Sequence, residues 1–190
     1  MKRHLVLVTV LTLVLAMKSR GQGFFNFANG ASGVNAPISD FNGFSNPATP
    51  LSGTAYKADY YWGPAGIIDP TVLISGGQAI SFAANGYFFG GTQIINGQTG
   101  TVTLQIRVWR ASDGATYAAA AGTGGAHAGG GNLIQVALGT GAGTVPNMVG
   151  LQSFTIAVAG PEPATFLIFL IGCGALLMRR PPRRGAAALR

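Results

Sequence analysis

Apolar and polar residues alternate through much of residues 22–160, and this pattern predicts a series of short β-strands. In residues 101–110, TVTLQIRVWR, every even position from 102 to 108 is apolar, so these side chains share one face of a strand. Residues 53–62, GTAYKADYYW, predict a second strand of the same kind. Further strands are expected at 23–28, 72–75, 79–83, 87–89, 93–95, 116–120, 133–138 and 151–158.

Turn signals separate these predicted strands. Asn85-Gly86, Asn96-Gly97 and Asp113-Gly114 tolerate the positive φ that tight hairpins require. Residues 22–160 contain no sustained helical periodicity that could cover a parallel sheet. We therefore expect an all-β fold, an antiparallel β-sandwich of the Ig-like or jelly-roll-like kind, with a closed barrel as the alternative. The glycine-rich segment 122–131 is expected to be a poorly ordered loop.

The two ends of the chain are apolar and flanked by basic residues. Residues 1–21 have the basic start, apolar centre and polar end of a secretory signal peptide, although an uncleaved N-terminal anchor is the alternative. Residues 164–178 are uncharged and predict a short transmembrane helix of about 22 Å. The basic tail 179–190 follows, and its first four arginines set the topology with the C-terminus in the cytoplasm. These four are Arg179, Arg180, Arg183 and Arg184.

Charge is concentrated at these ends. The whole chain has a formal net charge of +7, but nine of its twelve Lys and Arg residues lie before residue 22 or after residue 160. The middle contains three Lys or Arg residues and four Asp residues, a net charge of −1. Because phosphate binding needs a basic patch on the folded domain, nucleic acid is not an expected partner.

Pro161-Glu162-Pro163 directly precedes the apolar run and the arginine cluster. The two prolines break any helix upstream and favour extended geometry, which suits a substrate bound as a strand. This constellation resembles the PEP-CTERM sorting signal of Gram-negative bacteria, which a membrane-embedded exosortase recognises. The resemblance implies that Pro161, Glu162 and Pro163 form the recognition motif and that the tail 161–190 is removed during sorting. The alternative is an ordinary tail anchor with a proline-rich spacer.

The predicted exported domain, residues 22–160, also resembles a group of small Gly/Ala-rich PEP-CTERM proteins from Verrucomicrobia-like bacteria. The likeness rests on residues 26–29, NFAN, residues 50–56, PLSGTAY, and residues 150–154, GLQSF. Members of this group have no activity that could be transferred to this chain.

Residues suited to catalysis or metal binding are few. His127 is the one histidine of residues 22–160, and its glycine-rich surroundings predict a solvated loop residue. Asp59 and Asp69 flank a Gly-Pro turn, and their proximity stays open. Asp40 begins a D-x-N-G sequence like that of a calcium loop, but position 51 lacks the acidic ligand, so a simple turn is favoured. We expect no enzyme activity, no metal and no cofactor.

Aromatic residues provide the remaining candidate site. They are Tyr56, Tyr60, Tyr61, Trp62, Tyr87, Phe88, Phe89 and Trp109. Alternation places half of these rings in the core, and the others are expected to be ordinary strand residues. The alternative is a glycan-stacking surface, for which Tyr61 and Trp109 are the better candidates, because each shares a strand face with charged residues.

The expected function is that of a non-enzymatic surface or extracellular-matrix protein, and the alternative is a carbohydrate-binding module. Expected partners are signal peptidase, exosortase, exopolysaccharide and, transiently, the inner membrane.

Overall fold

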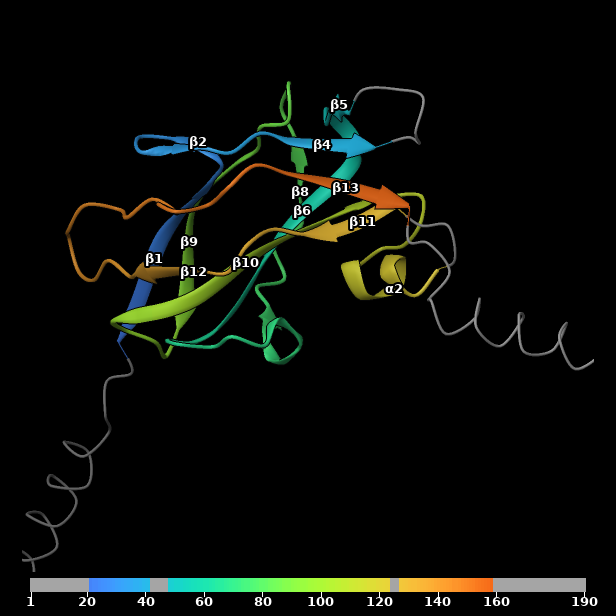
Figure 1. Ribbon diagram of the computed structural model, residues 1–190. Helices are drawn as coiled ribbons and strands as arrows, with labels where there is room; N and C mark the ends of the chain where they lie inside the picture. Colours follow the sequence, from blue (N-terminus) through green and yellow to red (C-terminus); the bar gives the residue numbers. More distant parts are fainter. Residues whose placement is uncertain (1–20, 42–47, 124–126, 159–190) are drawn as a thin grey trace, which may run out of the picture.

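The computed structural model describes residues 21–41, 48–123 and 127–158, which form thirteen strands and two short helical segments (Figure 1). The strands are β1 (Gln22–Ala28), β2 (Gly30–Ala31), β3 (Val34–Asn35), β4 (Ile38–Phe41), β5 (Thr49–Pro50), β6 (Gly53–Pro64), β7 (Ile74–Ser75), β8 (Ile80–Phe82), β9 (Phe89–Asn96), β10 (Thr101–Arg110), β11 (His127–Gly130), β12 (Ile134–Ala137) and β13 (Phe154–Val158). The helical segments are the 3-10 turn η1 (Pro70–Val72) and the α-helix α2 (Tyr117–Ala121). The prediction of an all-β fold is confirmed.

Nine of these strands form one large sheet. Its order is β5-β4-β13-β11-β10-β6-β7, with β12 also pairing β10 and β8 also pairing β6. Strands β1 and β9 form a separate antiparallel ribbon, and β2 and β3 form a small hairpin. The antiparallel prediction is wrong for one pair, because β13 runs parallel to β4. No hairpin forces the direction of these two strands, since more than 100 residues separate them in the chain.

The ladder between β6 and β10 is the centre of the large sheet. It runs without a break from the pair Val102–Pro64 to the pair Arg110–Tyr56. The even positions of β10 from Val102 to Val108 are buried in the main hydrophobic core, as the alternation predicts. Phe25 and Phe27 of β1 pack against this core side of the sheet.

The opposite face of the β6–β10 ladder is also covered, and here the prediction of exposure is wrong. Tyr61 is 8% exposed and Trp109 is 1% exposed. The loop that contains η1 lies over one part of this face, since the Ile67 N–H donates to Thr103 Oγ1 at 3.2 Å. Helix α2 contacts β10 and β11 and covers another part (Figure 1). Alternation distinguishes the two faces of a strand, but it does not reveal which distant segments cover each face.

Helix α2 replaces the strand expected at 116–120. Thr116 is the N-cap, and its Oγ1 accepts a hydrogen bond from the Ala119 N–H at 3.2 Å. Four alanines follow Tyr117, and alanine has the highest helix propensity of all residues. The short helix places Tyr117 against Tyr61 and Trp109, with ring centroids 6.0 and 6.4 Å away.

Buried Asn29 joins three segments beside the core. Its Nδ2 donates to the carbonyls of Ala36 and Gly86, at 2.7 and 2.8 Å, and its Oδ1 accepts from the Phe88 N–H at 2.7 Å. The predicted Asn85-Gly86 turn therefore lies against β4. Gly86 has φ +83°, and a Cβ there would lie 2.5 Å from the Ile38 carbonyl oxygen, so only glycine fits.

Candidate functional site

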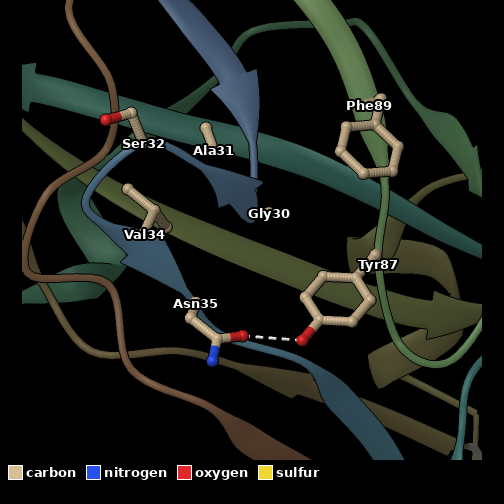
Figure 2. A pocket seen from close by; sticks show the side chains of 7 residues that line it. All are labelled: Gly30, Ala31, Ser32, Val34, Asn35, Tyr87 and Phe89. Carbon is tan, nitrogen blue, oxygen red and sulfur yellow. Dashed lines mark hydrogen bonds between the residues drawn. The ribbon is translucent and has the colours of Figure 1, made fainter.

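A cavity with aromatic walls lies beside the β2–β3 hairpin and has a volume of about 550 Å³ (Figure 2). We call it the aromatic pocket. Its lining residues are Gly30, Ala31, Ser32, Val34, Asn35, Tyr87 and Phe89. None of these residues carries a carboxylate, an imidazole or a thiol, and the polar side chains of the pocket are the hydroxyls of Ser32 and Tyr87 and the amide of Asn35.

The two rings of the aromatic pocket are positioned by the hairpin opposite them. The Tyr87 hydroxyl donates to Asn35 Oδ1 at 2.6 Å, which holds the ring against β3 (Figure 2). Gly30 allows this close approach, because a Cβ there would lie 2.8 Å from Tyr87 Cδ1 and 3.4 Å from Phe89 Cζ. Phe89 remains 60% exposed. An exposed ring beside amide and hydroxyl groups is suited to the apolar face of a sugar.

Sequence reasoning included Tyr87 and Phe89 among the aromatic residues but selected Tyr61 and Trp109 as the exposed pair. Residues 87–89 contain the feature that distinguishes Tyr87 and Phe89 from the buried Tyr61 and Trp109. Phe88 is fully buried in the core, so its two neighbours must face the other way. The charged neighbours of Tyr61 and Trp109 pointed to exposure, but Lys57 and Arg107 are half-buried and Asp59 is buried.

A buried polar cluster joins β4, β6, β11 and the turn after β10 near one end of the large sheet. The prediction that His127 is a solvated loop residue is wrong, because His127 begins β11 and is 7% exposed. Its Nδ1 lies 2.7 Å from Asp40 Oδ1, and the Tyr56 hydroxyl donates to Asp40 Oδ2 at 2.5 Å. The His127 N–H donates to Asp113 Oδ2 at 2.8 Å. Asp40 and His127 are 87 residues apart in the chain, so no local pattern predicts their contact.

The ionisation of this His127 cluster follows from burial and charge. Burial raises the pKa of Tyr56 to about 12, with further contributions from its hydrogen bond to Asp40 and from the Asp40 charge. At neutral pH the Tyr56 hydroxyl therefore keeps its proton and is the donor to Asp40. Burial alone would raise the pKa of Asp113, but hydrogen bonds from Arg110 and from the His127 N–H lower it.

Asp40 and His127 form an Asp–His pair within the His127 cluster. Asp40 occupies Nδ1, and no serine, threonine or cysteine of the described residues hydrogen-bonds Nε2. Nucleophilic catalysis needs such a hydroxyl or thiol within hydrogen-bond reach of the base. Through the Asp40 carboxylate, the cluster connects β4, β6 and β11.

The aspartates considered as candidate ligands or catalytic groups lie in three different settings. Asp59 is buried in β6, where it accepts hydrogen bonds from Ser75 Oγ at 2.5 Å and from the Gln78 N–H at 3.2 Å. Asp69 is exposed and caps η1, and hydrogen bonds from the Thr71 hydroxyl and the Thr71 N–H lower its pKa. Asp40 lies in a strand rather than in a turn or calcium loop. Within residues 21–41, 48–123 and 127–158, no three acidic, histidine or cysteine side chains gather in a metal-binding group.

The sequence motifs at the two ends fall outside the described residues. These are residues 1–20 of the predicted signal peptide, the sorting motif Pro161–Pro163, the apolar run 164–178 and the arginines from Arg179 to Arg184. Among the residues that the structure does describe, no helix is both long and apolar enough to cross a membrane. Comparison with known proteins gives no match among protein-family models, curated proteins or solved structures.

Proposed function

We propose that this chain is an exported, non-enzymatic protein of the cell surface or extracellular matrix, sorted by an exosortase through Pro161, Glu162 and Pro163. The observation that carries the proposal is the order of three segments: the Pro-Glu-Pro motif, the uncharged run 164–178 and the arginine cluster. The prolines keep the motif extended for recognition as a strand. The arginines keep the C-terminus in the cytoplasm and leave the motif on the far side of the membrane.

In this proposal residues 22–160 are the cargo, and the signal peptide and the sorting signal are removed. Signal peptidase cleaves near Gly21, and the protein is then a single-pass inner-membrane protein until the exosortase acts. The strand β13 ends at Val158, and two residues separate it from the motif, so the exosortase would act close to the folded domain. The mature protein is retained among exopolysaccharide at the surface or in the matrix.

The cargo domain is a β-sandwich in this proposal. The β1–β9 ribbon is the smaller layer, and the large sheet is the other. Phe25 and Phe27 of β1 contact Tyr60 of β6 with ring centroids 5.0 and 5.3 Å apart, which supports two sheets packed face to face.

Glu162→Ala is expected to leave the tail attached and the protein in the inner membrane, because Glu162 carries the only charge of the motif. Immunoblotting of fractionated host cells measures both the processing and the location. Arg190→Ala, a change of charge beyond the arginine cluster, is the control and is expected to be processed normally. Normal processing of Glu162→Ala would overturn the sorting proposal.

The aromatic pocket favours a second function, that of a carbohydrate-binding module for exopolysaccharide. Phe89 offers an exposed ring, and Tyr87, Asn35 and Ser32 supply hydroxyl and amide groups around it. Sugar recognition combines such a stacking surface with a few placed hydrogen-bonding groups. The binding surface is thus the aromatic pocket, in place of the buried Tyr61 and Trp109.

Phe89→Ala is expected to weaken retention on immobilised host exopolysaccharide by about tenfold, because a ring stack contributes on the order of 1–1.5 kcal/mol. Retention can be measured by affinity electrophoresis with the purified protein. Ile68→Ala is the matched control, because Ile68 is 89% exposed and does not line the aromatic pocket. Equal retention of wild type and Phe89→Ala would rule out the aromatic pocket as the glycan site.

A further inference from the structure

A second cavity, of about 400 Å³, lies on the covered polar face of the β6–β10 ladder. We call it the Arg107 cavity. Pro70 and Thr71 of η1 form one wall, Tyr117 of α2 and Gly130 of β11 form another, and Gln105 and Arg107 of β10 contribute from the sheet. It shares no lining residue with the aromatic pocket.

The Arg107 guanidinium is held in place by its neighbours. Its Cζ lies 4.0 Å from the ring centroid of Tyr61 and 5.1 Å from that of Tyr117. Its Nε donates to Gln105 Oε1 at 2.8 Å, and its Nη2 donates to the Pro70 carbonyl. The orientation of the Gln105 amide is fixed in turn, because its Nε2 donates to the Gly131 carbonyl at 2.9 Å. The guanidinium is therefore pre-organised before any ligand arrives.

The charge of Arg107 has no carboxylate partner among the described residues. The ion pairs in that part of the chain are Arg110–Asp113 and Asp40–His127. Asp59 is the cross-strand neighbour of Arg107, but its carboxylate bonds to Ser75 and Gln78 and lines a different, smaller cavity. A guanidinium has five N–H donors, and residues of the described chain accept from two of those of Arg107. A half-buried charge with spare donors favours an anionic partner.

We propose that the Arg107 cavity binds a carboxylate-bearing sugar, a uronic acid residue of an acidic polysaccharide. The planar guanidinium fork matches the two oxygens of a carboxylate. The Thr71 hydroxyl, whose proton is donated to Asp69, can still accept from a ring hydroxyl, and Gln105 Nε2 has a second N–H beside the one donated to Gly131. Tyr117 supplies an aromatic wall. The volume lies within the range of about 300–1,000 Å³ that is typical of ligand pockets. The proposal depends neither on sorting by an exosortase nor on the aromatic pocket.

Isothermal titration calorimetry of the protein purified from its host tests the proposal, with trigalacturonate as the probe and maltotriose and acetate as comparison ligands. We expect trigalacturonate to bind at least tenfold more tightly than either comparison ligand, and we expect added salt to weaken its binding. Equal affinity for maltotriose would overturn the role of the carboxylate. Equal affinity for acetate would overturn the role of the sugar, and absence of trigalacturonate binding would overturn the proposal itself.

Two substitutions of Arg107 test whether this residue binds the trigalacturonate carboxylate. Arg107→Gln removes the charge and is expected to weaken trigalacturonate binding by about tenfold or more, as for a lost hydrogen bond to a charged group. Arg107→Lys keeps the charge and the apolar stem but loses the fork, so an intermediate affinity is expected from a variant that retains the fold. Arg110→Gln is the matched control on the same strand, because Arg110 already pairs with Asp113. Wild-type affinity in both Arg107 variants, or an equal loss in Arg110→Gln, would overturn the assignment.

Discussion

Trp109→Ala is expected to lower the free energy of unfolding by about 3–5 kcal/mol, the range found for large aromatic residues removed from a packed interior. Trp109 is among the largest fully buried side chains of the described residues. Its Nε1 donates to the Gly114 carbonyl at 2.9 Å, and its ring contacts Tyr117 of α2. The substitution therefore leaves a cavity under α2 and an unpaired carbonyl beside it. Urea denaturation followed by circular dichroism measures the loss.

Phe89→Ala is the matched control for this experiment, because Phe89 is an aromatic strand residue that is mostly exposed. We expect it to cost less than about 1 kcal/mol, as exposed positions lose little on truncation. Trp109 and Phe89 should thus behave in opposite ways: the first substitution affects stability, and the second affects glycan retention. A loss below about 1 kcal/mol for Trp109→Ala would contradict the buried position of this residue.

Asp40→Ala is expected to destabilise the protein by about 2–5 kcal/mol, because two buried polar groups lose their partner at about 1–3 kcal/mol each. The substitution leaves Tyr56 Oη and His127 Nδ1 without their shared acceptor in the interior of the sheet. Each buried polar group without a partner costs free energy because it has lost its water as well. Urea denaturation gives the total loss, and amide hydrogen exchange shows whether β4, β11 and β13 open first.

Control substitutions for Asp40→Ala are available both within the His127 cluster and outside it. Tyr56→Phe and His127→Gln each remove one arm of the cluster, so each is expected to cost less than Asp40→Ala. Asp69→Ala removes an exposed aspartate that caps η1 and is expected to have a much smaller effect. If Asp40→Ala were no more destabilising than Asp69→Ala, the His127 cluster would not hold these strands together.

The His127 cluster lies next to β13, the strand that precedes the proposed sorting motif. Strand β13 lies between β4, which contains Asp40, and β11, which contains His127. The hydrogen bond between these side chains therefore connects the two strands that flank β13. Because Pro161 follows shortly after β13, this connection supports the part of the domain that would face the exosortase.

The regular parts of the fold were predictable from the sequence. The strand expected at 101–110 is β10, and the strand expected at 53–62 lies within β6. The Asn85-Gly86 turn occurs where it was expected, with positive φ at both residues. These features depend on local alternation and on backbone preferences of single residues, which a sequence displays directly.

The candidate sites were less predictable, because each depends on contacts between distant segments. The assignment of 116–120 as a strand was wrong because the Thr116 cap and the alanines favour a helix. That helix and the η1 loop together cover Tyr61, Trp109 and Arg107. His127 was misjudged because its partner Asp40 lies 87 residues away.

The sequence by itself determined the all-β class, the two faces of each long strand and the motifs on which the sorting proposal rests. Tertiary structure alone decided which strand faces opposite the main core are covered, which aromatic rings stay exposed and which residue His127 contacts. The physical reason is that alternation encodes the direction of a side chain, whereas burial depends on the segment that packs over it. Phe89 and Trp109 show the difference, because both lie on strands and only the second lies beneath a helix.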